Sequence, residues 1–249
     1  MPSGEGTLYI VATPIGNLAD ITFRALDVLR SVDLCLAEDT RHSRILFDKY
    51  GISTPMRSCY RHNEKNRVDP VIADLEAGKK IALISDAGTP GISDPGERLI
   101  RDAIAAGIRV EAIPGACSPV QALLLSGMRL DRFAFEGFIP RKGNKRNSRL
   151  RDIADQPGSV VLFESAMRLE ALCEDLLELC GDRQMAVCRE LTKQFEETVR
   201  GSVSDIRDRI KTGSLTLKGE FVIVIEGNES YSKLHKKAHR NKYDDKYDD

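Results

Sequence analysis

A run of small and turn-forming residues, "SDAGTPGISDPG" at 85–96, separates an apolar stretch from a helical pattern. Connections between a strand and a helix usually have roughly two to six residues, so this loop is long. Glycines let backbone amides approach a ligand closely, and the low charge of the loop suits a ligand held by amide groups and apolar contacts. Ordinary turns are also rich in glycine and proline, so the run alone leaves both interpretations open.

Three further segments follow predicted strands in the same way. They are "TPIGN" (13–17), "AEDTRH" (37–42) and "IPGACS" (113–118). Ligands of open α/β sheets bind at the carboxyl ends of the strands, so the four loops together predict one ligand site at that edge. The sequence contains no GxGxxG, GxxxxGK[ST] or GxSxG motif, which argues against a dinucleotide fold, a P-loop enzyme and an α/β hydrolase.

A basic segment, "RKGNKRNSRLR" at 141–151, has six basic residues and no acid in a chain whose 37 basic and 38 acidic residues nearly cancel. Basic helix faces are often simply solvated. An uncompensated cluster in a nearly neutral protein favours contact with a phosphate backbone. Candidate contacts with such a backbone are Arg141, Lys142, Lys145 and Arg146, with Arg41 and His42 as further ones in the first half of the chain.

Composition limits the class of protein. The 249 residues are 41% apolar and 30% charged, which is enough to bury a core. No apolar run has membrane-spanning length and the start lacks the features of a secretory signal, so we expect a cytoplasmic protein. The six cysteines form no CxxC pair and the four histidines no cluster, so we expect reduced thiols and no metal site.

Strand-like and helix-like patterns alternate along the chain. Strands are expected at 7–12, 32–39, 80–85, 109–115, 132–138, 159–165, 184–190 and 220–227, and helices at 21–32, 40–51, 69–77, 95–107, 118–128, 145–155, 166–180 and 203–211. Thr40 is expected to cap the helix at 40–51, which Gly51 ends, and Gly78 closes the helix at 69–77. The alternation predicts mostly parallel sheets with helices on both faces.

The pattern restarts after the first four loops, so we expect two α/β domains, at 1–118 and 119–228, with a ligand cleft between them. Residues 229–249 form a charged tail with a tandem "KYDD" and a single leucine. Such a segment buries too little apolar surface to offset its ordering entropy, and we expect it to be disordered.

Seven segments, in order from Thr7 to Gly227, resemble the ribosomal RNA small subunit methyltransferase I family of the tetrapyrrole-methylase superfamily. They are "YIVATPIGNLADITFRALDVL", "CLAEDTRHSRILFDKYGI", "ISDAGTPGISDPGERLIRDA", "IPGACSPVQALLLSGM", "FEGFIPRKG", "VLFES" and "KGEFVIVIEG". The resemblance implies the α/β fold of class III methyltransferases, with S-adenosylmethionine between two domains. It also implies a homodimer that methylates the 2′-oxygen of a cytidine in 16S ribosomal RNA of the small subunit.

The resemblance also implies the cofactor contacts. The loop "AGTPGI" is similar to the superfamily's GDPxx loop, with Thr89 in place of its usual Asp, and Ile15 stands where relatives carry a proline. The implied contacts are Ile15, Gly88, Thr89, Pro90, Ile92, Cys117, Ser118, Phe163, Glu164, Gly219 and Glu220. Two departures stand out: Ser165-Ala166-Met167 replaces the family's Ser-Pro-His, and the charged tail replaces a small helical region.

Methyl transfer to a ribose hydroxyl needs in-line positioning and benefits from a base or a cation near the acceptor oxygen. The candidates are Asp86 and Asp39, followed by Glu38 and Lys193. Each of them also fits a helix cap or a solvated charge.

Two other functions compete with RNA methylation. A small-molecule methyltransferase of the tetrapyrrole kind should keep Asp at position 89 and lack the basic segment, and this sequence does neither. A non-catalytic RNA-binding module would retain the cofactor loops without binding the cofactor.

Overall fold

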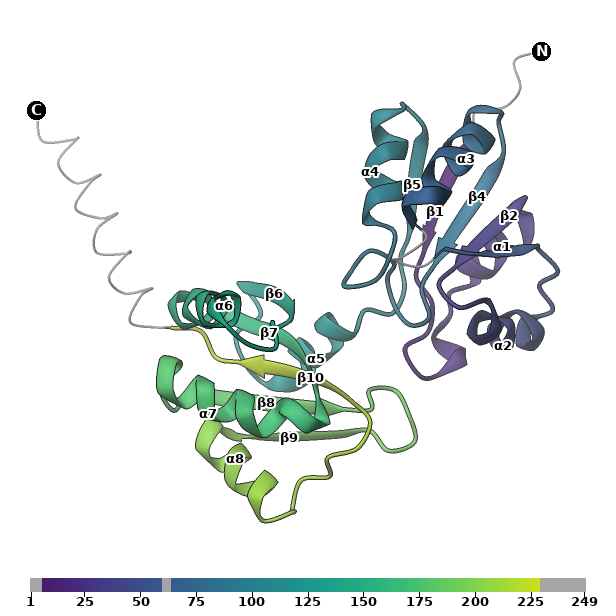
Figure 1. Ribbon diagram of the computed structural model, residues 1–249. Coiled ribbons are helices and arrows are strands. Elements are labelled where there is room, and N and C mark those ends of the chain that lie inside the picture. The colour runs from purple at the N-terminus through teal and green to yellow at the C-terminus, as the bar shows by residue number, and fades with distance from the viewer. Residues whose placement is uncertain (1–5, 60–63, 229–249) are drawn as a thin grey trace, which may run out of the picture. The chain divides into compact units, whose positions relative to one another are not determined.

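The computed structural model describes residues 6–59 and 64–228 (Figure 1). The predicted tail at 229–249 lies outside the described residues. The chain divides into two compact units, the first ending at Ser118 and the second beginning at Pro119.

The first unit is a parallel sheet. Its strands are β1 (Thr7–Val11), β2 (Leu34–Ala37), β3 (Met56–Ser58), β4 (Lys80–Ile84) and β5 (Arg109–Ile113), in the order β3-β2-β4-β1-β5. All four neighbouring pairs run parallel, as the alternating pattern predicts. The sequence did not predict β3, a three-residue edge strand without a buried residue.

Helices cover both faces of this sheet. They are α1 (Phe23–Ser31), α2 (Thr40–Tyr50), α3 (Glu64–Glu76) and α4 (Glu97–Ala105), and a 3-10 turn (Leu18–Asp20) precedes α1. One apolar cluster joins α1 and α2 to the sheet, and a second joins α3 and α4 to the strand residues that face the other way, so both faces are buried.

One predicted helix cap and one predicted helix start in this unit are wrong. Asp39 caps α2 instead of Thr40, because its carboxylate accepts a hydrogen bond from the backbone N–H of Arg41 at 2.9 Å. Helix α3 begins at Glu64 rather than at 69 and contains Pro70. Proline removes one helical hydrogen bond, but burial of Val68 and Val71 against the sheet keeps the turns on both sides of it helical.

The second unit is a mixed sheet. Its strands are β6 (Phe133–Phe138), β7 (Ser159–Ser165), β8 (Gln184–Arg189), β9 (Glu197–Ser202) and β10 (Glu220–Ile225), in the order β6-β7-β10-β8-β9. Only β6 and β7 run parallel; β10 is antiparallel to both β7 and β8, and β9 is antiparallel to β8. The prediction of a mostly parallel sheet is therefore wrong for this unit, and the sequence did not predict β9.

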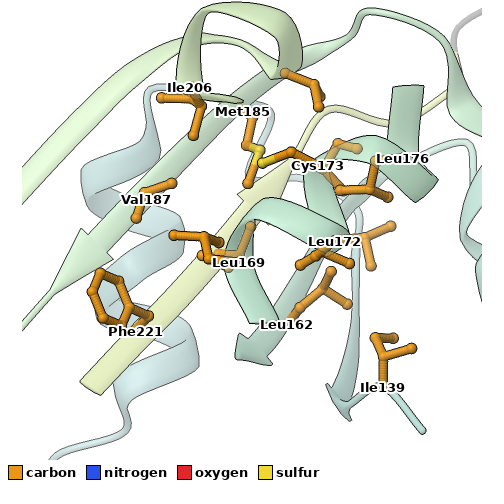
Figure 2. Packing of buried hydrophobic residues seen from close by; sticks show 14 of the residues in the cluster. Ile139, Leu162, Leu169, Leu172, Cys173, Leu176, Met185, Val187, Ile206 and Phe221 are labelled. Carbon is orange, nitrogen blue, oxygen red and sulfur yellow. The ribbon is translucent and has the colours of Figure 1, made fainter. Parts of the chain in front are cut away.

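One face of this sheet carries the principal core of the unit. Helices α6 (Asn144–Asp155), α7 (Leu169–Cys180) and α8 (Val203–Lys211) pack there, with α7 between the other two. Their apolar residues interlock with alternate strand residues, among them Leu162, Met185 and Phe221 (Figure 2). A 3-10 turn (Ala166–Arg168) leads into α7.

The opposite face is covered less completely. Helix α5 (Ser118–Ser126) lies toward β8 and β9, because the Cys188 thiol contacts the Ala122 carbonyl at 3.9 Å and Arg200 donates to the Leu125 carbonyl at 2.9 Å. Strand β6 is at the other end of the sheet, and its Phe133 and Phe138 are exposed.

Candidate functional site

The four loops at the carboxyl ends of the first sheet are brought together by hydrogen bonds. Thr13 and Gly88 exchange backbone bonds of 2.9 and 3.1 Å, and the Thr13 hydroxyl donates to the Ser85 carbonyl at 3.1 Å. The Thr89 hydroxyl donates to the Ala116 carbonyl at 3.2 Å. These bonds join loops 13–17, 85–96 and 113–118 at one edge of the first unit.

Gly88 is the tightest point of this arrangement. Its φ of +90° belongs to the left-handed region that favours glycine. A Cβ on Gly88 would lie 3.2 Å from the Cγ2 atom of Ile15 and 3.7 Å from the Ala116 carbonyl oxygen. The residue is buried, so any side chain here would push into Ile15 or into the space in front of the loop.

The remaining predicted cofactor residues of this unit lie in the same loops. Pro90 is buried, Cys117 and Ser118 are half-buried, and Ile92 is 42% exposed. These loops present backbone amides, hydroxyls and methyl groups, with Asp86 and Asp94 as the acids of the stretch at 85–96.

The fourth loop joins the others through the predicted carboxylates. Asp86 Oδ1 accepts a hydrogen bond from the backbone N–H of Asp39 at 3.0 Å. The Asp39 carboxylate binds the guanidinium of Arg41 at 3.1 and 2.7 Å, and this pairing holds its pKa well below the usual range. Asp39 is therefore a poor proton acceptor at neutral pH, and Asp86 is the better candidate.

The other predicted residues of this loop differ in exposure. Glu38 is half-buried, whereas His42 and the Arg41 side chain are exposed. Arg41 forms an ion pair with Asp39, so an RNA phosphate would have to compete with the Asp39 carboxylate for the guanidinium.

In the second unit, antiparallel pairing brings the predicted cofactor residues together. Phe221 opposes Glu164, and Glu220 opposes Ser165, so the end of β7 lies beside the start of β10. Glu164 is buried and binds the guanidinium of Arg168 at 2.5 Å and the backbone N–H of Ser165 at 2.7 Å. Its Oε2 atom accepts no hydrogen bond from a described residue, which leaves a buried carboxylate oxygen able to accept a ligand donor.

Lys193 belongs to a cluster of opposite charges. Its ammonium group lies 3.1 Å from Glu190 Oε1 and 2.9 Å from Glu220 Oε2. Burial by itself would lower the pKa of Lys193, but the hydrogen bonds to Glu220 and Glu190 outweigh it and raise the pKa. Lys193 is thus a fixed cation at neutral pH and unsuited to act as a base.

Glu190 is a structural partner that sequence reasoning missed. Its φ is +50°, and its carboxylate accepts from the Glu220 backbone N–H at 2.9 Å. The same side chain occupies the space where Gly219, with a φ of +100°, would carry a Cβ, since that atom would lie 2.7 Å from the Glu190 Cγ. Only the fold brings residues 190 and 219 together, so no local pattern marks Glu190.

The basic segment divides into two kinds of side chain. Arg141, Lys142 and Lys145 are exposed and form no ion pair with a described residue. Arg146 is 8% exposed, binds Asp175 through Nε at 2.8 Å and donates to the Pro140 carbonyl at 3.1 Å. Its guanidinium is engaged inside the fold, so we leave Arg146 out of the RNA-binding set proposed below.

The three exposed cations surround the amino end of α6. That helix begins after Gly143 with no side-chain cap and no acid in its first turn. Cations at the amino end of a helix oppose its dipole, which destabilises the protein without a bound anion by about 0.3–1 kcal/mol per charge. The same arrangement of backbone N–H groups and cations suits a bound phosphate.

The described residues hold neither a cluster of metal ligands nor a membrane-spanning helix. No group of three metal-ligating side chains occurs among them. Within residues 6–59 and 64–228, no helix is both long and apolar enough to cross a membrane.

The sequence is similar to known methylases along most of its length. The family model of tetrapyrrole (corrin/porphyrin) methylases matches residues 7–207. Ribosomal RNA small subunit methyltransferase I of Haemophilus influenzae is 45% identical over 89% of this chain and 79% of its own length. The protein of the same name from Synechocystis sp. is also 45% identical over the same shares.

Solved structures resemble the fold at low sequence identity. A diphthine synthase has a TM-score of 0.66 and 15% identity, over 89% of this chain and 90% of its own. Uroporphyrin-III C-methyltransferase of Thermus thermophilus, solved in complex with S-adenosylhomocysteine, has a TM-score of 0.61 and 18% identity, over 89% and 97%.

Proposed function

The chain belongs to the tetrapyrrole methylase family and, within it, to the ribosomal RNA small subunit methyltransferase I family; on that premise we propose that it methylates the 2′-oxygen of a cytidine in 16S ribosomal RNA. The methyl donor is S-adenosylmethionine. RNA is proposed as the methyl acceptor because three exposed cations without an ion-pair partner among the described residues lie at the uncapped start of α6.

The cofactor fits the residues present in each unit. In the first, Gly88 has no side chain, so a ligand can approach its backbone closely beside Ile15 and the Ala116 carbonyl, among neutral groups. In the second, the unsatisfied oxygen of Glu164 is an acceptor suited to the amino groups of S-adenosylmethionine, and its negative charge favours a cationic ligand. Phe163, Gly219 and Glu220 adjoin it along β7 and β10.

The reaction moves one methyl group and one proton. When bound, S-adenosylmethionine would supply a methyl group on a sulfonium whose sulfur is a neutral thioether after transfer, and a base of the protein would take the proton of the ribose hydroxyl. Asp86 is the proposed base, because the Asp39 carboxylate is held by Arg41 and Lys193 is held as a cation by two carboxylates.

We further propose that the enzyme works in the cytoplasm as a homodimer, on 16S RNA or on the assembled small subunit. The family resemblance supports this assignment.

The test is a map of ribose methylation on small-subunit RNA from cells with and without this protein. We expect one cytidine to lose its 2′-O-methyl group in the deletion strain and to regain it with the intact gene but not with a Gly88→Arg variant. Purified protein with radiolabelled S-adenosylmethionine should restore the mark on subunits from the deletion strain. An unchanged methylation map, together with no transfer in vitro, would refute the proposal.

A further inference from the structure

Three phenylalanine rings contact one another at the β6 edge of the second sheet. The ring centroids of Phe135 and Phe163 lie 5.0 Å apart in an edge-to-face arrangement. Those of Phe138 and Phe163 lie 5.3 Å apart with the ring planes tilted by 55°. Phe163 is half-buried, and Phe138 is 58% exposed at the open end of the group.

A β-bulge makes this grouping possible. Residues three apart on a regular strand point to opposite faces of the sheet. The register of β6 against β7 shifts between Phe135 and Gly137, whose φ is +62°. The extra residue returns Phe138 to the face of Phe135 and pairs it directly with Phe163.

The rings lie on the face of the sheet away from the main core. Leu162 and Ile139, which neighbour Phe163 and Phe138 in sequence, belong to the core cluster under α6, α7 and α8. On the ring side, α5 contacts β8 through Cys188 and β9 through Arg200. One side of the Phe138 ring is therefore covered by no described element. This exposed apolar surface contributes nothing to the stability of the fold.

The backbone that follows the ring is held from two directions. Arg168, itself fixed by Glu164, donates to the Ile139 carbonyl at 3.5 Å. Arg146, fixed by Asp175, donates to the Pro140 carbonyl at 3.1 Å. These two arginines keep Phe138 and the start of the basic loop in one position, which lowers the entropy lost when a ligand binds.

We propose that Phe138 is a stacking platform for one unpaired base of the RNA, and that the phosphates beside that base contact Arg141 and Lys142. The proposal rests on the proposed function and adds how the RNA is held. Arg141 follows Phe138 by three residues, so their Cα atoms lie at most about 11 Å apart, within reach of adjoining parts of one nucleotide strand. Aromatic rings beside uncompensated cations are the recognition chemistry of single-stranded RNA.

The charge around Phe138 favours a nucleic acid over an apolar protein segment as the ligand. Arg141, Lys142 and Lys145 form no ion pair with a described residue, so an anionic partner gains three interactions here without breaking any. An apolar protein segment would cover the ring but leave those cations as they are.

The experiment compares two single-stranded probes of equal length: an oligocytidylate, and the same backbone with an abasic ribose at each central position. Both carry the same phosphates, so the ratio of their affinities isolates stacking. We expect the wild-type protein to bind the oligocytidylate more tightly by roughly 5–150-fold, the range for stacking one base on an aromatic ring. Phe138→Ala should abolish this preference, and Phe138→Trp should retain it.

The matched control is Phe133→Ala. Phe133 is 45% exposed on the same strand, five residues before Phe138, and stacks on no ring of the described residues. Its loss should leave the preference for bases intact. Cofactor affinity, measured by calorimetry, and the oligomeric state, measured by sedimentation, should be the same for Phe138→Ala as for the wild type.

Four results would overturn the inference. These are an unchanged base preference in Phe138→Ala, an equal loss in Phe133→Ala, a loss of cofactor affinity with RNA binding intact, and dissociation of a dimer with RNA binding intact. A wild-type protein that methylates subunits but binds both probes equally would refute the platform and leave the proposed function standing. Absence of methylation would refute the function itself.

Discussion

The candidate site of the first unit is built from backbone, and that of the second from side chains. Around Gly88 the contacts are main-chain hydrogen bonds and two threonine hydroxyls, packed so closely that one methyl group has little room. Around β6 and β7 the contacts are ion pairs and aromatic rings, with three exposed cations beside them.

Burial of the two sheets explains this difference. Apolar clusters cover both faces of the first sheet, so only its loops are available to a ligand. The second sheet has its main cluster on one face, which leaves part of the other face exposed. We therefore expect function in the first unit to depend on shape, and in the second on charge.

The largest effect is expected from filling the space at Gly88. Gly88→Arg should weaken S-adenosylmethionine binding by more than about 100-fold, that is, by more than about 2.7 kcal/mol, through overlap with the ligand. Gly88→Ala should weaken it by less, since only a methyl group is added next to Ile15. Calorimetry at low and high salt measures both affinities, and neither should change much with salt.

The control for Gly88→Ala is Gly107→Ala. Gly107 has a φ of +72° and no atom within 4 Å of the added methyl, so it bears the backbone strain without the contact. Equal cofactor affinities in the two alanine variants would place the cofactor elsewhere.

The next effect concerns Asp86, the proposed base, which lies in the loop at 85–96. Asp86→Asn keeps an oxygen to accept the Asp39 N–H but removes the charge, so kcat should fall by about 10²–10⁴-fold with cofactor and RNA affinity unchanged. Asp33→Asn is the matched control, because Asp33 accepts the backbone N–H of Lys80 at 2.8 Å in the same way. Single-turnover methylation would measure both, and a loss below about threefold in Asp86→Asn would exclude it as the base.

A third effect tests the dependence on charge in the second unit. Replacing Arg141, Lys142 and Lys145 with alanine should make the negative slope of log affinity for RNA against log salt shallower. The change should be up to about 2, at roughly 0.7 per single-strand phosphate contact. Cofactor affinity should not change. Fluorescence anisotropy over a series of salt concentrations measures the slope.

The charge-matched control replaces Arg30, Arg101 and Arg207 with alanine. These arginines each have an acidic partner, Asp27, Glu97 and Asp208 respectively. If this variant loses as much slope as the first, overall charge rather than the basic loop attracts the RNA.

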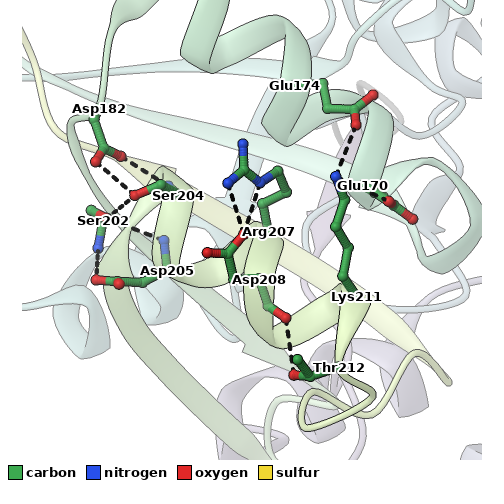
Figure 3. Close-up of polar contacts among 10 residues, drawn as sticks. All are labelled: Glu170, Glu174, Asp182, Ser202, Ser204, Asp205, Arg207, Asp208, Lys211 and Thr212. Atoms are coloured by element: carbon green, nitrogen blue, oxygen red, sulfur yellow. Dashed lines mark hydrogen bonds and ion pairs between the residues drawn. The ribbon is translucent and has the colours of Figure 1, made fainter.

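The smallest effect concerns stability of the second unit and pH. The Asp182 carboxylate accepts the side-chain and backbone hydrogens of Ser204 at 2.7 and 2.8 Å, next to the Ser202 cap of α8 (Figure 3). The hydroxyl of Ser204 is the main cause that lowers the pKa of Asp182 below its ordinary value of 3.8. Because the folded pKa is the lower one, this stabilisation is present above about pH 4 and is lost as the pH falls through the folded pKa.

Asp182→Asn should therefore lower the melting temperature slightly at neutral pH, and this deficit should shrink as the pH falls below about 4. Thermal unfolding over that range measures it. A melting-temperature deficit that persists unchanged at low pH would show that the effect is steric rather than ionic.

The sequence alone predicted most of the elements and the meeting of the four loops in the first unit. In the first unit the alternation of apolar strands and helices correctly predicted a parallel sheet, whose strands place their carboxyl ends at one edge. Gly51 and Gly78 end their helices with positive φ, as local conformational preference predicts. These features depend on residues close together in the chain.

Tertiary structure decided the features that depend on partners far away in the sequence. Arg146 and its exposed neighbours look alike in the basic segment, but Asp175, 29 residues later, takes Arg146 into the fold. Lys193 is fixed as a cation by Glu220, 27 residues away, and β10 inserts antiparallel between β7 and β8. Phe138 is exposed because a bulge turns it away from the core and α5 lies over other strands. Local periodicity does not predict such pairings. The energy of an ion pair or of strand pairing depends on which residue, distant in sequence, lies beside it in the folded chain.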